Sequence, residues 1–542
     1  MKKYLILLII LGVVLLTGCT KPDPQPTINF EKVGDIVDSI EIMYYDFDNI
    51  AYSNVEVQDE INRIRTSYDE LNEDEKAMVT NYEDFLKIEQ GYKSYLADEQ
   101  AKLEEAQKVQ KAVDEAADYA LNLIPSKNTG EDINLPYDYT SEDGITVNIS
   151  WKSNKPQTIT NQGKVTQPRK SSTKVTISAE CYSGKIEKTV SKTVTVGPLA
   201  YEKLPEKPVF AYYYSNQRAL TDIERETIDV INLSFGGIDE NGEVYVTGLN
   251  YATVLQERKY GIRVCFSVQK KEGFVEWTST AAKREKLAQS FVDVCNDYHF
   301  DGVDIDWEYP DGTSQVNNYV AFMELLYTKM KAANSNYIVS SAMYGGNGVS
   351  KYNAGKSHHY MDYIHLMTYD LNSNDFSQHL TSLRESNNGY SSVEETVNYY
   401  LNAGVPKEKL IIGAGFYGKV YELSLSGTKF IGEKPVSNPE SILYSSIKDT
   451  YLSMIGKESN RLKVERRWDS VAQAAYLCIT EYDGNGKVTG RKFITYDDTE
   501  SISLKCKYLF DLDLGGLMFW ELGYEDRKDN DLVKAVKEGF NK

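Results

Sequence analysis

Eight short apolar runs recur over residues 207–542, and this repetition constrains the fold more than any other feature of the chain. Each run has the length of a buried strand, and amphipathic stretches of helical length separate one run from the next. Eight strands that alternate with helices predict a closed (β/α)8 TIM barrel, and the length of this region suits a barrel with insertions. The runs lie at 209–213, 230–235, 262–267, 302–306, 338–343, 363–369, 410–413 and 516–520.

The interval between the seventh and eighth runs is much longer than the others. Within it, residues 475–479 and 491–496 have the β-branched and aromatic composition of strands. We therefore expect a small α+β insertion at about 421–500.

Two further regions precede the barrel, and they differ in periodicity. Residues 31–124 are acidic and nearly free of Gly and Pro, and apolar residues from Leu96 to Ile124 recur at threes, fours and sevens. This pattern predicts an all-α helical stalk. At 125–200 the period changes to two, which predicts a small β-sandwich that resembles bacterial immunoglobulin-like spacer domains. The expected fold class is multidomain: helical region, β-sandwich, then barrel.

The first 19 residues have the features of an export signal. Two lysines precede an apolar run at 4–16, which is too short to span a bilayer as a mature helix. The run closes on Leu-Thr-Gly-Cys19, which resembles the lipobox of bacterial lipoproteins. The resemblance implies an acylated Cys19 as lipid anchor, followed by a Pro-spaced tether at 20–30. We therefore predict attachment to the extracytoplasmic face of the cell membrane.

Charge and cysteine spacing argue against other partners. The net charge of -20, from 80 acidic and 60 basic residues, opposes binding to nucleic acid. The six cysteines form no CxxC pair, and the histidines lack metal-ligand spacing, so we expect neither metal nor cofactor. Residues 413–418 match GxGxxG, but the chain runs on without opening a helix, so we interpret these glycines as the end of the seventh strand.

Three acids alternate along the fourth run: Asp304, Asp306 and Glu308. Since successive side chains of a strand point to opposite faces, these three share one face, which we place inside the barrel. Three carboxylates at this spacing cannot all ionise easily, so at least one pKa should be raised. Glu308 lies at the C-terminal end of the strand, where barrel active sites are found. We therefore expect Glu308 to hold the shared proton and to act as general acid.

The run DGVDIDWEYP at 301–310 carries a DxxDxDxE pattern and resembles the signature of family 18 glycoside hydrolases, the chitinases and their relatives. The resemblance covers about residues 207–540 and includes MTYD at 367–370 and GGLMFW at 515–520. It implies that Glu308 protonates the glycosidic oxygen. It also implies that Asp306 turns between Asp304 and the substrate and holds the N-acetyl group.

The same resemblance implies roles for five further residues. Tyr369 would donate its hydroxyl to the acetamide, and Asp370 would orient it. Trp520 would form the floor under the sugar, and Tyr212 would lie beneath the same site. Met367, from the same MTYD segment, is a further expected substrate contact.

The implied reaction is retaining hydrolysis of β-1,4-linked N-acetylglucosamine polymers, chitin or chitooligosaccharides, in which the acetamide of the substrate replaces a protein nucleophile. Two alternatives stay open: an endo-β-N-acetylglucosaminidase acting on glycoprotein glycans or peptidoglycan, and a non-catalytic chitin-binding surface lectin. The presence of Glu308 argues against the lectin. Two departures bear on polymer specificity: Gln269 and Lys270 stand where the family often has Gly-Gly, and residues 371–374 replace a loop that commonly contains Gly.

Overall fold

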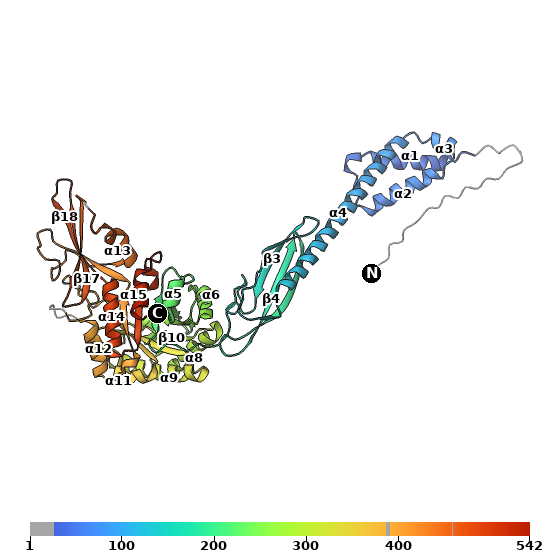
Figure 1. Cartoon of the computed structure of the whole chain (residues 1–542). Coiled ribbons are helices and arrows are strands. Elements are labelled where there is room, and N and C mark those ends of the chain that lie inside the picture. Colours follow the sequence, from blue (N-terminus) through green and yellow to red (C-terminus); the bar gives the residue numbers. More distant parts are fainter. Residues whose placement is uncertain (1–26, 386–390, 458, 542) are drawn as a thin grey trace. The chain divides into compact units, whose positions relative to one another are not determined.

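The computed structural model describes residues 27–385, 391–457 and 459–541 (Figure 1). It divides into two compact units, the first extending to Val113 with residues 142–145, and the second formed by the rest of the chain. Cys19 and the apolar run before it lie outside the described residues. Within the described ranges, none of the helices is both long and apolar enough to cross a bilayer.

The first unit is a helical bundle. Asparagine side chains cap the starts of its first three helices by accepting hydrogen bonds from backbone N–H groups. Apolar residues at helical spacing meet in one core that includes Ile36, Ile40, Ile64, Phe85 and Ile88. The elements are α1 (Phe30–Tyr44), η1 (Phe47–Asn49), α2 (Val55–Asp69), α3 (Glu73–Ala77) and the first part of α4 (Tyr82–Leu123).

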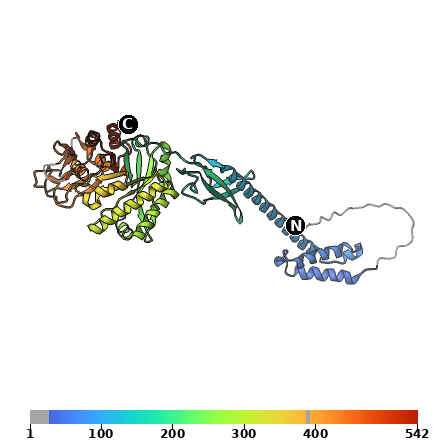
Figure 2. The same ribbon diagram turned by 90° about the horizontal axis from the view of Figure 1, so that it is seen from below.

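The second unit begins with the last turns of α4 and a five-stranded sheet, here called the sheet domain. Its strands are ordered β1-β5-β4-β3-β2, and Figure 2 shows them as extended ribbons that follow the end of the long helix. Along β3 exposed and buried residues alternate, as the period of two predicts. The strands are β1 (Lys127–Asn128), β2 (Asp138–Thr140), β3 (Thr146–Ser153), β4 (Thr173–Ser183) and β5 (Ile186–Val196).

Only part of the apolar stripe predicted on α4 is buried. Val113, Ala117 and Ala120 are buried, whereas Leu96 and Leu103 remain about half exposed, at 46% and 53%. The reason is that the last turns of the helix meet the sheet domain, where Lys188 binds the Asp114 carboxylate and Lys192 binds the carbonyl of Leu121. Helical periodicity identifies an apolar face but not where a partner covers it.

The barrel prediction is confirmed. Eight parallel strands follow one another in the ring order β6-β19-β13-β12-β11-β10-β9-β7, and pairing of β6 with β7 closes the ring. The strands are β6 (Val209–Tyr213), β7 (Val230–Ile238), β9 (Arg263–Val268), β10 (Gly302–Ile305), β11 (Ile338–Tyr344), β12 (Tyr363–Met367), β13 (Leu410–Gly415) and β19 (Gly516–Trp520).

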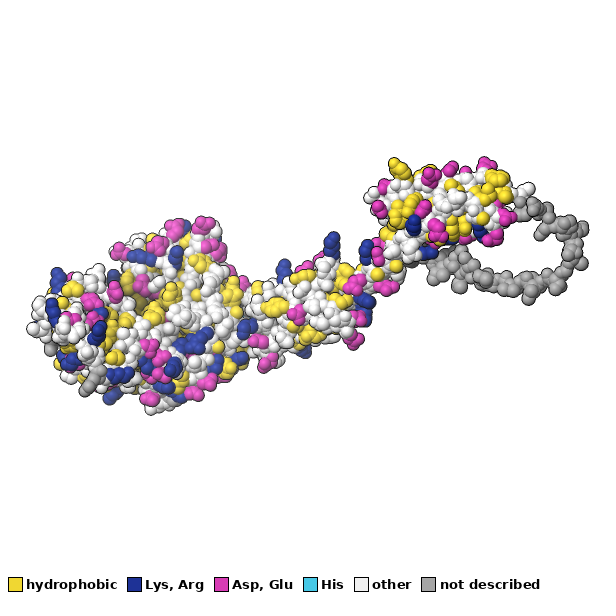
Figure 3. All heavy atoms as spheres, turned by 90° about the horizontal axis from the view of Figure 1, so that it is seen from above, with side chains coloured by type: hydrophobic (Ala, Val, Ile, Leu, Met, Phe, Trp, Pro, Cys, Tyr) yellow, Lys and Arg dark blue, Asp and Glu magenta, His cyan; other side chains and the backbone are white. Residues whose placement is uncertain are grey.

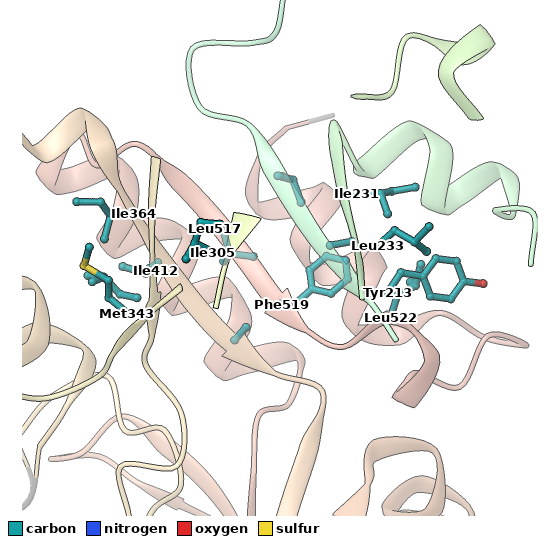
Figure 4. Close-up of a cluster of buried hydrophobic side chains, with 14 of the residues drawn as sticks. Tyr213, Ile231, Leu233, Ile305, Met343, Ile364, Ile412, Leu517, Phe519 and Leu522 are labelled. Carbon is teal, nitrogen blue, oxygen red and sulfur yellow. The ribbon is translucent and has the colours of Figure 1, made fainter. Parts of the chain in front are cut away.

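Helices surround the barrel, and the outward-facing side chains of the strands pack beneath them. Figure 4 shows part of this layer, with Leu233, Ile305, Ile412 and Leu517 in one cluster. On the face seen in Figure 3, acidic and basic side chains are interspersed over the surface. The remaining elements are α5 (Asp222–Thr227), β8 (Val244–Tyr245), α6 (Tyr251–Val254), η2 (Leu255–Tyr260), α7 (Lys271–Trp277), α8 (Ala281–Tyr298), α9 (Gly312–Ala333), α10 (Val349–Tyr352), α11 (Ala354–Ser357), η3 (His358–Tyr360), α12 (Val393–Asn402), η4 (Lys407–Lys409), α14 (Thr499–Leu512), η6 (Leu522–Tyr524) and α15 (Asp531–Gly539).

The insertion between the seventh and eighth barrel strands is an antiparallel sheet in the order β15-β14-β18-β17-β16. It starts at Tyr417, before the expected residue 421, because only Phe416 separates its first strand from β13. Its elements are β14 (Tyr417–Glu422), β15 (Glu440–Leu443), α13 (Tyr444–Thr450), η5 (Leu452–Met454), β16 (Leu462–Asp469), β17 (Ala474–Tyr482) and β18 (Val488–Tyr496).

The first acid of the DxxDxDxE pattern, Asp301, lies just before β10, at the end of the strand opposite Glu308. Arg169, from the loop after β3, binds it through Nε at 2.7 Å and Nη2 at 3.1 Å, and both side chains are almost fully buried. Burial alone would raise the pKa of Asp301, but Arg258 and Arg169 hold it below its usual range. This residue therefore ties the base of the barrel to the sheet domain.

Candidate active site

The carboxyl ends of the barrel strands surround a cavity of about 200 Å³. Of the site residues predicted within the barrel, all but Asp304 line it. Asp304 lies one layer deeper, because it precedes Asp306 by two residues on the same face of β10. The lining consists of Tyr212, Phe235, Gln269, Asp306, Glu308, Tyr309, Ala342, Tyr344, Gly345, Met367, Tyr369, Asp370, Leu371, Tyr417 and Trp520.

Asp304 is completely buried, and both of its carboxylate oxygens accept hydrogen bonds. Oδ2 accepts from the Tyr212 hydroxyl at 2.8 Å and from the Ser267 hydroxyl at 2.7 Å. Oδ1 accepts from the Ser340 hydroxyl at 2.7 Å. Hydroxyl donors from three other strands therefore compensate the loss of water around this carboxylate.

Asp306 is also buried but is less well satisfied. Its Oδ2 accepts a long hydrogen bond of 3.2 Å from Gln269, and its buried Oδ1 has no partner among the described residues. Burial raises the pKa of Asp306 well above its ordinary value, and the neighbouring charges of Glu308 and Asp304 raise it further. The sequence predicts at least one raised pKa in this row of acids, and the pKa of the deeply buried Asp306 is raised.

Glu308 is partly exposed and faces the cavity, where its Oε1 accepts a hydrogen bond of 2.8 Å from Gln269. It lies beyond the last residue of β10, so solvent and a ligand can both reach it. A carboxyl group in this position can transfer a proton to a bound molecule.

Tyr369 follows β12 and turns its hydroxyl toward the cavity. Among the described residues, the hydrogen-bond contact of this hydroxyl is the weak thioether acceptor of Met518, at 3.8 Å. Burial, and next the charge of Asp306, raise the pKa of Tyr369, which keeps the hydroxyl protonated at neutral pH. Tyr369 is therefore an available hydrogen-bond donor.

Two other residues of the MTYD segment, Met367 and Asp370, form part of the wall. Met367 is partly buried at the end of β12. Asp370 is exposed, has a left-handed φ of 52°, and lies 3.5 Å from the ammonium group of Lys419 on β14. Asp370 thus connects the barrel rim to the insertion.

Trp520 ends β19 and is surrounded by aromatic rings. Its ring is nearly parallel to those of Phe235 and Tyr214, with centroids 5.5 and 6.0 Å away, and the Tyr212 ring is tilted at 5.7 Å. Such a rigid aromatic group presents a flat apolar surface to a ligand.

The sequence analysis assigned no role to four aromatic residues of the lining: Phe235, Tyr309, Tyr344 and Tyr417. Tyr309 directly follows Glu308, and this adjacency was a usable signal. Burial, and then the carboxylate of Glu308, raise its pKa. Tyr417 comes from the first strand of the insertion, and nothing in its local sequence points to the cavity.

The arrangement combines a proton-transferring carboxyl group, a buried carboxyl of raised pKa, a free phenolic donor and an aromatic floor. Within the described residues, no three His, Cys, Asp or Glu side chains lie close enough together to hold a metal ion. The cavity groups thus offer acid–base chemistry to a polar ligand that can stack on an aromatic ring.

Comparisons with known proteins agree with this description. Chitinase B of Serratia marcescens is 28% identical over 359 residues, which cover 54% of this chain and 70% of that protein. Chitinase A1 of Niallia circulans is 29% identical over 284 residues, which cover 47% of this chain and 39% of that protein.

Solved structures share the barrel. A family 18 N-acetylglucosaminidase from Paenibacillus barengoltzii matches with a TM-score of 0.55 at 26% identity, covering 61% of this chain and 99% of that one. A mutant family 18 chitinase from Cycas revoluta in complex with (GlcNAc)4 has a TM-score of 0.53 at 20% identity, with coverages of 61% and 99%, and it shows likeness of fold.

Two family profiles match the chain. The atrophied bacterial Ig domain matches residues 117–199, which confirms an immunoglobulin-like identity for the sheet domain. The profile of glycosyl hydrolases family 18 matches residues 209–525, more than half of the chain. The chain therefore belongs to family 18 of the glycosyl hydrolases.

Proposed function

We propose that this enzyme hydrolyses β-1,4-linked N-acetylglucosamine polymers, most simply chitin or its oligomers, with retention at the anomeric carbon. The observation that carries the proposal is the convergence of Asp306, Glu308 and Tyr369 on one cavity beside Trp520. These groups match what an acetamido sugar offers: an amide N–H, a carbonyl oxygen, a glycosidic oxygen and an apolar ring face.

In the proposed reaction, the sugar to be cleaved stacks on Trp520, and Glu308 donates its proton to the glycosidic oxygen as the bond to the anomeric carbon breaks. The acetamide oxygen of the same sugar attacks that carbon, so no protein nucleophile is needed. Tyr369 donates a hydrogen bond to the acetamide, and Asp306 accepts from its N–H and stabilises the positive charge that develops on nitrogen. Glu308, now ionised, takes a proton from the water that opens the cyclic intermediate.

Positioning is the main contribution of the protein in this scheme. Holding the acetamide oxygen against the anomeric carbon makes the attack intramolecular, and well-oriented intramolecular reactions gain roughly 7–11 kcal/mol over their bimolecular counterparts. Proton transfer by Glu308 adds about 10²- to 10⁴-fold. The names of the chitinases to which the chain is similar support chitin as the substrate class.

The same catalytic groups would serve an endo-β-N-acetylglucosaminidase, so the products decide between substrates. The purified chain is incubated with chitotetraose, a high-mannose glycopeptide and peptidoglycan in parallel, and early products are followed by NMR. We expect cleavage of chitotetraose with the β-anomer formed first. If only the glycopeptide is cleaved, the substrate is an N-glycan and not chitin. If chitotetraose binds without being cleaved, the result favours the lectin alternative.

We further propose that the protein is held at the cell membrane by a lipid on Cys19. The support is the LTGC sequence at the end of the short apolar run at 4–16. The Pro-spaced residues 20–30 would then act as an extended tether between the bilayer and the helical unit.

A further inference from the structure

Gln269 lies beside the catalytic carboxylates because of strand register. It directly follows β9, in which Val268 pairs with Ile305 of β10. The backbone N–H of Asp306 donates to the carbonyl of Val268 at 3.0 Å, so the two strands remain in register at this level. The side chain of Gln269 consequently starts next to Asp306. In the sequence it stands where family 18 often has a glycine, which has no side chain to place there.

A single nitrogen of Gln269 contacts both carboxylates. Nε2 lies 2.8 Å from Oε1 of Glu308 and 3.2 Å from Oδ2 of Asp306. A side-chain amide carries two N–H donors, so it can serve two acceptors at once. The residue is otherwise exposed at the cavity rim. Its orientation therefore depends on these two hydrogen bonds.

We infer that Gln269 is a positioning residue of this active site, which bridges Asp306 and Glu308 and fixes the direction in which Glu308 presents its proton. The inference rests on the proposed function. Glu308 lies beyond the end of β10, where strand pairing no longer holds the backbone. The hydrogen bond from Gln269, which follows β9, therefore limits the rotation of the Glu308 side chain. A proton donor held in one direction loses less entropy in the transition state.

The bridge also acts on the proton affinity of the pair. A donor to an ionised carboxylate favours the ionised form, so the amide lowers the proton affinity that burial and mutual repulsion raise. The titratable groups that act on the pair are Asp304 from β10, Tyr212 from β6, Tyr309, Tyr352 from α10 and Tyr369. All five are acids, whereas Gln269 contributes donors without adding a charge.

The role of Gln269 can be tested with two substrates that differ in leaving group. Chitotetraose releases a sugar and depends strongly on protonation, whereas an aryl chitobioside releases a stable phenolate and depends on it weakly. Gln269→Met keeps the bulk and removes the donors, Gln269→Gly removes both, and Gln269→Glu replaces the donors by a third carboxylate. Lys271→Gln, on the exposed surface of α7, is the control. Melting temperatures establish that each variant is folded.

Activity of the unmodified chain on the aryl chitobioside tests the proposed function first. We then expect Gln269→Met and Gln269→Gly to lose about tenfold in kcat/KM on chitotetraose, and only about two- to threefold on the aryl substrate. The pH optimum should move upward by about one unit in both variants, and further in Gln269→Glu, since a like charge raises the proton affinity of the pair. The Lys271→Gln profile should match that of the unmodified chain.

Two outcomes would overturn the inference while leaving the proposed function intact. One is an equal loss on both substrates with an unchanged pH profile, which indicates that Gln269 only shapes the cavity. The other is full activity of Gln269→Gly with impairment of Gln269→Met, which indicates that bulk at this position matters and the hydrogen bonds do not.

Discussion

Tyr212 donates its hydroxyl hydrogen to Oδ2 of Asp304 at 2.8 Å, at the bottom of the row of acids. Ser267 and Ser340 donate to the same carboxylate, so both oxygens of the buried Asp304 are hydrogen-bonded. Its fixed negative charge then acts on Asp306 above it. Asp306 lacks a comparable set of hydroxyl donors, and burial, followed by the charges of Glu308 and Asp304, raises its pKa.

Asp306→Asn should reduce kcat/KM on an aryl chitobioside by roughly 10²-fold, because the amide cannot supply the negative charge that stabilises the developing cation. Burial, and next the charge of Glu308, raise the pKa of Asp306 well above its ordinary value, so Asp306 loses its proton at a higher pH than a free carboxyl group does. We therefore expect kcat/KM of the unmodified chain to fall on the alkaline side, and this limb to move in Asp306→Asn. Asp311→Asn, exposed on the following loop, should leave the profile unchanged.

Glu308→Gln should lower kcat on chitotetraose by about 10²- to 10⁴-fold, since the amide cannot transfer a proton. Affinity for the oligosaccharide, measured by calorimetry, should change little because the aromatic floor and Tyr369 remain. Glu272→Gln on α7 is a matched control at an exposed position. Normal turnover by Glu308→Gln would remove this residue from the proposed mechanism.

Tyr369→Phe should lower kcat/KM but leave the stability of the fold nearly unchanged. The hydroxyl has only the weak Met518 contact to lose within the described residues, so Tm should stay within about 2 °C of the unmodified value. Loss of its hydrogen bond to the acetamide should reduce kcat/KM by about 10- to 100-fold. Tyr245→Phe, which alters an exposed tyrosine outside the cavity, serves as control. A large fall in Tm together with unchanged kinetics would mean that the hydroxyl is structural.

His299 should make the fold sensitive to acid. Burial, and next the charge of Arg258, lower its pKa to about 4 from 6.5. The unfolded chain therefore binds a proton between these pH values that the folded chain does not, so stability is retained above pH 6.5 and lost as the pH falls toward 4. The loss from this residue is about 3 kcal/mol at most.

Denaturant unfolding from pH 7 to 4.5 measures this slope. His299→Asn should flatten it, since asparagine does not titrate and tolerates the left-handed φ of 65° found there. An identical slope in His299→Asn would assign the acid sensitivity to other groups.

Cys19→Ser should release the protein from membranes, because the serine hydroxyl cannot take the place of the thiol that receives the lipid. Fractionation of cells that express the full chain measures the distribution. Thr20→Ser, at the next residue, should remain with the membrane. Retention of Cys19→Ser in the membrane fraction would contradict the lipid anchor.

Much of the fold could be predicted because it depends on local patterns. Eight apolar runs gave eight barrel strands, and alternation along β10 put Asp304 and Asp306 on one face. The side-chain contacts within the active site were harder to predict from the sequence. Gln269 reaches Glu308 only through the register of two strands, and the raised pKa of Asp306 depends on burial, which no short segment of sequence reveals.

Asp301 shows where an autonomous catalytic fragment of this enzyme would have to begin. The family match starts at residue 209, yet the guanidinium that neutralises Asp301 belongs to Arg169. A fragment cut at residue 209 would lack Arg169 and would leave Asp301 with Arg258, whose Nε is 3.4 Å away, and with the backbone N–H of Val264. Removing one member of a buried ion pair costs about 3–5 kcal/mol, a large share of the stability of any domain. The immunoglobulin-like segment therefore stabilises the barrel through Arg169, and its removal should lower the stability of the barrel near Asp301.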